Sequence, residues 1–155
     1  MDDSVRMILG SEQYERSEST LRAEFVQVEI GLQSDDVGPL RAAARRLRSL
    51  AAAELGWFRL SVRTHFLTSC TQRHLEALLL GESDNRTRLD LLRALRFASE
   101  RLIDHPMWAP IANERDAAKW RTWLTRVAEE AATSRDSGVR AEAGYVLVAS
   151  GKSCG

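Results

Sequence analysis

Apolar residues recur every three or four positions along several segments, and this periodicity constrains the fold more than any other feature of the chain. It is clearest at residues 39–55, where Pro39 suits a first helical turn and Gly56 suits a helix end. One face is apolar and rich in alanine: Leu40, Ala43, Ala44, Leu47, Leu50, Ala51 and Leu55. The pattern predicts an amphipathic helix whose small residues allow a neighbouring helix to approach closely.

Residues 87–103 have the same periodicity and a recognisable start. Thr87 and Asp90 have the spacing of a capping box, in which the hydroxyl accepts from the third helical amide and the acid reaches back. The apolar face is formed by Leu89, Leu92, Leu95, Leu102 and Ile103. Because the residue before a proline disfavours helix, Pro106 sets the end of this segment.

Three more helices are predicted from pattern and end signals. Residues 71–80 are closed by Gly81, residues 113–133 form an amphipathic segment, and Ser137 caps a final helix that runs to residue 150. In the second of these, the apolar face contains Trp120, Leu124, Val127 and Ala131, with Trp123 beside it.

Two segments fit a helix or a strand. In residues 24–33, the alternation of Val26, Val28 and Ile30 is typical of a half-buried strand, although the same segment also has helical spacing. Residues 57–67 are similarly ambiguous. We predict an all-α fold of six to seven helices, either a bundle or a short stack of helical hairpins, with an α+β fold using these two segments as strands as the alternative.

Length and composition favour a single domain over residues 1–155. The chain is 44% hydrophobic and 28% charged, which is typical of a folded globular protein. No repeat of fixed period or composition shift marks a boundary. Residues 1–16 are predicted to be less firmly ordered, and residues 152–155 to form a tail.

The segment 136–151 resembles one unit of a HEAT-type helical repeat. The resemblance consists of Asp136, followed by Val139 and Arg140 and then by an Ala-rich helix. One such unit is too common in helical proteins to assign the chain to a family.

Cysteine usage and hydropathy indicate a cytoplasmic protein. The chain has two cysteines, Cys70 and Cys154, too few for a disulfide framework, and its acidic first residues differ from the basic start of a secretory signal. No stretch approaches the roughly 20 apolar residues of a membrane-spanning helix. We therefore expect no membrane association.

A row of arginines is the first candidate interaction surface. Arg41, Arg45 and Arg48 align on the polar face of the helix predicted at 39–55, and guanidinium groups bind phosphates and carboxylates bidentately. Lys plus Arg and Asp plus Glu each number 22, so the whole molecule has no basic field that attracts nucleic acid. Nucleic-acid binding through this row is therefore the alternative to protein binding.

Met107 and Trp108 form a second candidate surface, in an apolar loop between Pro106 and Pro110. Tryptophan is enriched at the centres of protein interfaces, so this loop is a possible anchor for a partner. Together the two surfaces predict a non-enzymatic protein-interaction or regulatory module with a protein partner. The sequence does not indicate its pathway or oligomeric state.

An enzyme using Cys70 and His74 is the less favoured hypothesis. These residues are one helical turn apart, and His65 is near in sequence, so a thiolate activated by an imidazole is conceivable. Such a site also needs an orienting group and an oxyanion hole, and a structural zinc needs about four ligands. We therefore predict no catalytic residues, no metal site and no cofactor.

Overall fold

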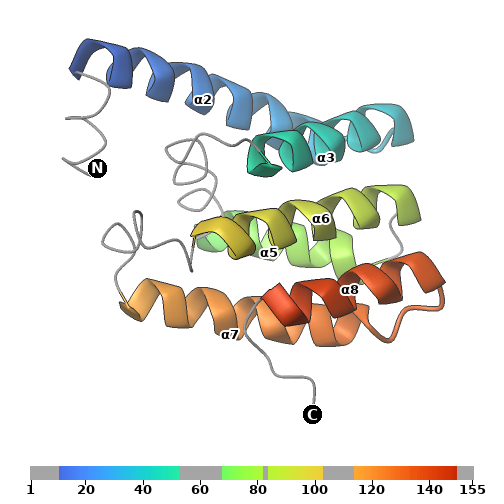
Figure 1. Cartoon of the computed structure of the whole chain (residues 1–155). Coiled ribbons are helices and arrows are strands. Elements are labelled where there is room, and N and C mark those ends of the chain that lie inside the picture. Colours follow the sequence, from blue (N-terminus) through green and yellow to red (C-terminus); the bar gives the residue numbers. More distant parts are fainter. Residues whose placement is uncertain (1–10, 53–67, 82–83, 103–113, 150–155) are drawn as a thin grey trace.

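The computed structural model describes residues 11–52, 68–81, 84–102 and 114–149, and these ranges contain six helices and no strand (Figure 1). The helices are α2 (Ser11–Leu32), α3 (Val37–Ala52), α5 (Ser69–Leu80), α6 (Asn85–Leu102), α7 (Glu114–Ala131) and α8 (Ser137–Ala149). The predicted all-α fold class is confirmed.

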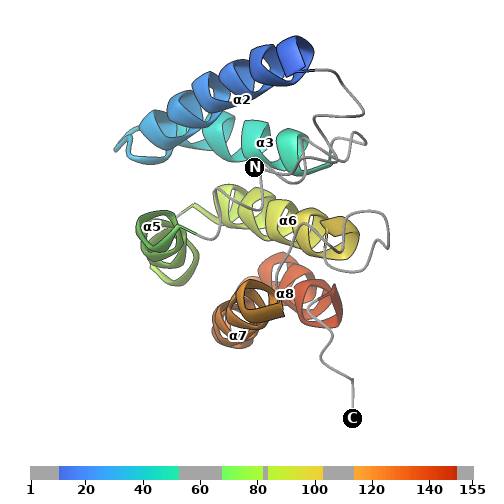
Figure 2. The same cartoon turned by 90° about the vertical axis from the view of Figure 1, so that its left-hand side faces the viewer.

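The helices are arranged as three stacked hairpins, α2–α3, α5–α6 and α7–α8 (Figure 1). Helices α3, α6 and α8 form one row, in which α6 packs against both of its neighbours. Helices α5 and α7 lie on one side of this row, and α2 lies over α3 at one end of the stack (Figure 2). Of the two predicted architectures, the structure is the stack of helical hairpins.

The ambiguous segment 24–33 is helical and belongs to α2. Its buried residues, Phe25, Val28 and Leu32, follow the helical spacing, whereas Val26 and Ile30 are 55% and 60% exposed. The strand alternative is therefore wrong for this segment, because packing against α3 selects a helical face. The other ambiguous segment, 57–67, lies outside the described residues. Of the residues predicted to be less firmly ordered, 1–10 also lie outside them, whereas 11–16 are helical and belong to α2. The predicted tail, 152–155, lies outside as well.

Helix α6 begins two residues before the predicted position, and the predicted capping box is wrong. Asp84 precedes the helix and its Oδ2 accepts hydrogen bonds from the Thr87 amide at 3.1 Å and the Thr87 hydroxyl at 3.2 Å. Asp84 therefore caps the helix as an N-cap acid. Asp90, predicted to reach back to the cap, instead pairs with Arg48 of α3.

The start of α8 differs in the same way. The Val139 amide donates to Oδ2 of Asp136 at 2.8 Å, so Asp136 is the capping residue, and Ser137 is the first residue of the helix. A carboxylate next to the serine outcompetes its hydroxyl, because a charged acceptor forms the stronger hydrogen bond with a helix N-terminal amide.

The core runs through all three hairpins as one apolar cluster. All six apolar-face residues of α3 that fall within the helix are buried, as are Trp120 and Trp123 of α7. The Trp120 indole donates to the Ser99 hydroxyl at 3.0 Å, which connects α7 to α6 inside the core. Because α3 and α6 pack side by side, charged residues from the polar faces of both helices lie next to one another.

Candidate anion-binding site between α3 and α6

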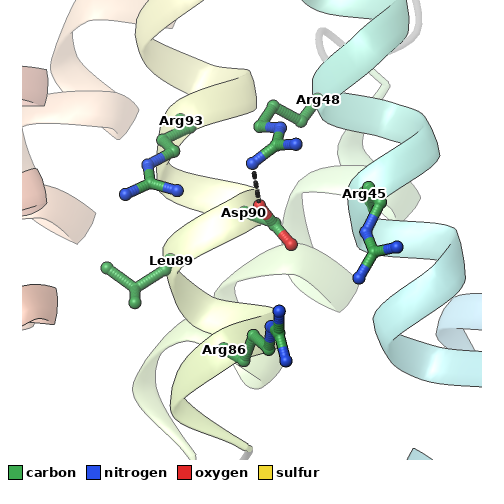
Figure 3. Close-up of a pocket in the computed structure, with 6 residues that line it drawn as sticks. All are labelled: Arg45, Arg48, Arg86, Leu89, Asp90 and Arg93. Carbon is green, nitrogen blue, oxygen red and sulfur yellow. Dashed lines mark hydrogen bonds and ion pairs between the residues drawn. The ribbon is translucent and has the colours of Figure 1, made fainter. Parts of the chain in front are cut away.

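A pocket of about 480 Å³ lies where α3 faces α6 (Figure 3). Four of its six lining residues are arginines and one is an acid: Arg45, Arg48, Arg86, Leu89, Asp90 and Arg93. Guanidinium groups thus outnumber carboxylates in the lining by four to one. In a chain with equal numbers of basic and acidic residues, this is a strong local excess of positive charge.

Helical spacing explains how both helices contribute. Arg45 and Arg48 are three positions apart on α3, and Arg86, Asp90 and Arg93 follow one another at four and three positions on α6. Residues at these spacings share one helix face. Because α3 packs against α6, the two charged faces meet along the edge of the contact.

The predicted row on α3 divides into one arginine that is free and two that are paired within the described residues. Arg41 donates from Nε and Nη2 to the two carboxylate oxygens of Asp84, both at 2.8 Å. Arg48 donates to Oδ1 of Asp90 at 2.7 Å. These bonds hold both side chains in place, so the row does not present three equivalent charges to a ligand.

The bidentate pair with Arg41 strongly lowers the pKa of Asp84. Hydrogen bonding to the Arg41 guanidinium, opposed by partial burial and helped by the bonds from Thr87, holds the pKa of Asp84 far below its usual range. Asp84 therefore stays ionised in the folded protein, and it fixes the position of α3 relative to the start of α6.

Arg45 and Arg86 are the available donors of the pocket. Both side chains are exposed, and neither guanidinium has a hydrogen-bond or ion-pair partner among the residues that the structure describes. Figure 3 shows the two side chains extending from α3 and α6 into the space between the helices, near Asp90. An anion in this space is reached from both helices.

Arg93 forms the wall of the pocket toward α8. Its Nε donates to Oε1 of Glu142 at 3.1 Å, and Arg96 approaches Oε2 of the same carboxylate at 3.8 Å. Glu142 has a side chain only 10% exposed. Glu142 thus partly compensates the charge of Arg93, as Asp90 compensates that of Arg48. Among the described residues, the charges of the pocket that have no carboxylate partner are those of Arg45 and Arg86.

The lining is rich in groups that bind anions, and its described residues contain no thiol, hydroxyl or imidazole. It offers guanidinium donors, one ion-paired carboxylate and one apolar side chain. Guanidinium forks match the geometry of phosphate and carboxylate oxygens. The chemistry of the lining therefore fits an oxyanion such as a phosphate or a carboxylate.

The α6 half of this pocket is not among the features predicted from the sequence. Arg86 and Arg93 are not predicted site residues, and the sequence pattern places Asp90 in a cap. The spacing of these three residues along one face of α6 was the available signal, but it does not indicate which helix lies opposite.

No hydrogen bond or ion pair joins Cys70 to His74 among the residues that the structure describes. Cys70 is an exposed free thiol, and His74 Nδ1 lies 3.4 Å from Oε2 of Glu29 on α2. In the described ranges, no group of three or more His, Cys, Asp and Glu side chains could hold a metal ion. His65 and the second predicted surface, Met107 and Trp108, lie outside the described residues.

None of the helices in the described ranges is long and apolar enough to span a membrane. The chain matches no protein-family model, and no curated protein or solved structure is significantly similar to it.

Proposed function

We propose that this chain is a non-enzymatic interaction module that binds an acidic group of a partner protein in the pocket between α3 and α6. The observation that carries the proposal is the pair Arg45 and Arg86, two exposed guanidinium groups that face one space from different helices. We also propose the cytoplasm as its compartment, because two cysteines are too few for a disulfide framework.

The pocket is preorganised for such a partner. Arg48 is held by Asp90, and Arg41 and Asp84 connect α3 to the start of α6, so the two helices keep their spacing without a ligand. Preorganisation reduces the entropy lost on binding. The charged surface is also local, which suits one anionic group on a protein.

The distribution of ion pairs favours a protein partner over nucleic acid. Asp84 pairs with Arg41 and Glu24 pairs with Arg46, so two arginines of α3 are compensated on either side of Arg45. Nucleic-acid binding depends on neutralising several phosphates in succession. Two available arginines neutralise fewer phosphates than a nucleic-acid strand presents in succession, so nucleic-acid binding is the second candidate function.

The test is a titration of ¹⁵N-labelled protein with an acetylated pentaglutamate peptide and, separately, with inorganic phosphate at low salt. We expect saturable shifts of the Nε–Hε signals of Arg45 and Arg86. In the double variant Arg45→Gln/Arg86→Gln, binding is followed from the backbone amide signals of α3 and α6. It should be lost while helical circular dichroism is kept, because both side chains are exposed.

A matched control changes the charge by the same amount elsewhere. Arg73 of α5 and Lys119 of α7 are exposed and lie outside the pocket. The variant Arg73→Gln/Lys119→Gln should bind both probes like the wild type. Equal losses in the two double variants, or no saturable shift at Arg45 and Arg86 with either probe, would contradict the proposal.

A further inference from the structure

We infer that the group recognised in this pocket is a phosphomonoester dianion, and that the partner is therefore a protein phosphorylated on a side chain. The inference rests on the proposed function and specifies its ligand. It follows from the number of available guanidinium forks, from the charge that they leave unbalanced, and from the compensation of the residues around them.

The guanidinium donors of the pocket match the acceptor oxygens of a phosphomonoester. Arg45 and Arg86 approach the same space from two helices, and each guanidinium presents parallel N–H groups. A carboxylate has two oxygens, which one fork occupies in a bidentate pair. A phosphomonoester has three terminal oxygens arranged tetrahedrally, so it can accept from two forks that approach from different directions.

The charge of the pocket also suits a dianion. Asp90 compensates Arg48, and Glu142 faces both Arg93 and Arg96, so at least two positive charges of the lining, those of Arg45 and Arg86, are left to a ligand. Near neutral pH a phosphomonoester has a charge between −1.5 and −2. A carboxylate has a charge of −1 and leaves one guanidinium unbalanced.

The uncompensated positive charge covers only a short part of the surface. Arg41 and Arg46, the charged neighbours of Arg45 on α3, are paired with Asp84 and Glu24. The unbalanced charge is therefore confined to the pocket and does not continue along α3. This confinement suits one doubly charged group, whereas a nucleic-acid strand has singly charged phosphates spread along its length.

The experiment compares three acetylated and amidated pentapeptides that differ only at the central residue. This residue is serine, phosphoserine or glutamate, and the other four residues are glycine and alanine. Binding is measured from the Arg45 and Arg86 Nε–Hε shifts at pH 7.5 and low salt. We expect the phosphoserine peptide to bind at least tenfold more tightly than the glutamate peptide, and the serine peptide to give no saturable shift.

The pH dependence separates a dianion from a monoanion. The second ionisation of a phosphomonoester has a pKa of about 6, whereas a glutamate carboxyl has one of about 4.3. Lowering the pH from 7.5 to 5 should weaken the phosphoserine peptide severalfold and leave the glutamate peptide nearly unchanged. Equal affinities for the two peptides, or a phosphoserine affinity that does not change with pH, would overturn the inference and leave the proposed function intact.

Two further measurements complete the test. Arg45→Lys/Arg86→Lys keeps the charge and removes both forks, and its binding is followed from the backbone amide signals of α3 and α6. Phosphoserine binding should weaken severalfold in this variant; unchanged affinity would overturn the inference that two guanidinium forks hold the phosphate. A twelve-nucleotide single-stranded DNA that shifts Arg45 and Arg86 at lower concentration than the phosphopeptide would also overturn the inference, in favour of nucleic acid. If no peptide and no DNA shifts these signals, the proposed function fails together with it.

Discussion

Arg41 and Asp84 are joined by two parallel hydrogen bonds of 2.8 Å, and the same carboxylate caps the N-terminus of α6 through Thr87. One side chain therefore starts a helix in the second hairpin and binds the first hairpin. Since Arg45 lies on α3 and Arg86 lies near the start of α6, Asp84 also sets the relative position of the two available arginines of the pocket.

Replacing Asp84 by alanine should destabilise the fold. The loss of the N-cap alone costs about 1–2 kcal/mol, and loss of the bidentate pair with Arg41 adds to it. Urea unfolding followed by circular dichroism measures the change. Asp35→Ala is the control, because Asp35 is an exposed acid between α2 and α3, and its removal should change the free energy of unfolding little. Similar losses in both variants would show that the cap and the ion pair contribute nothing specific.

The low pKa of Asp84 predicts a pH dependence of stability. The folded-state pKa lies below the unfolded value of about 3.9, so the contribution of Asp84 is complete above the unfolded pKa and is lost as the pH falls toward the folded-state pKa. Asp84→Asn keeps a capping oxygen but cannot titrate. The difference in free energy of unfolding between wild type and this variant should therefore be largest near pH 7 and should shrink below about pH 4. Parallel curves from pH 7 to pH 3 would refute this assignment.

Gly31 of α2 should not tolerate a methyl group. A Cβ at this position would lie 2.6 Å from the Cβ of Ala43 on α3, which is closer than real Cβ atoms approach one another. We expect Gly31→Ala to lower the free energy of unfolding by about 1–3 kcal/mol through overpacking, reduced by a gain in helix propensity of about 1 kcal/mol. The double variant Gly31→Ala/Ala43→Gly should recover part of the packing loss.

Gly144 of α8 is the matched control for Gly31, because it is also a helical glycine and a Cβ there meets nothing within 4 Å. Gly144→Ala should raise the free energy of unfolding by up to about 1 kcal/mol, since only helix propensity changes. The opposite signs expected for the two Gly→Ala substitutions are measured by urea unfolding. Equal effects would show that α2 and α3 can separate at no cost.

Ser99 should contribute to stability through its hydrogen bond with Trp120. Ser99 is fully buried and Trp120 is 1% exposed, so Ser99→Ala removes a buried acceptor and should cost about 1 kcal/mol or more. The indole N–H of Trp120 should also exchange faster with solvent, which NMR detects. Ser49→Ala is the control, because that exposed hydroxyl only bonds back to the Arg45 carbonyl on its own helix. An indole exchange rate that Ser99→Ala leaves unchanged would contradict this role.

Burial within each helix followed from the sequence wherever the apolar period was regular. The apolar face predicted for α3 is buried, and Trp120, Leu124 and Val127 of α7 are buried as expected. The helical period is a local property of the chain, so it reveals which side of a helix faces the core. In residues 24–33 the helical period and the strand-like alternation were both present, so the period alone did not decide between them; the structure shows a helix.

Helix starts were less predictable, because several good capping residues stand close together. Asp84 and Thr87 both suit the start of α6, and Asp136 and Ser137 both suit the start of α8. The choice at α6 involves other hairpins: Arg41 binds Asp84, and Arg48 binds Asp90, the acid that had been assigned to the cap. A local pattern contains no information about these partners.

The helical class, the buried faces of α3 and α7 and the arginine row on α3 could be predicted from the sequence, because each depends on residues within four positions of one another. The packing of α6 against α3, the compensation of Arg41 and Arg48 by Asp84 and Asp90, and the position of Arg86 opposite Arg45 appear only in the folded chain. These features could not be predicted because ion pairing and pocket formation depend on which helices pack together, and packing is a property of the whole core.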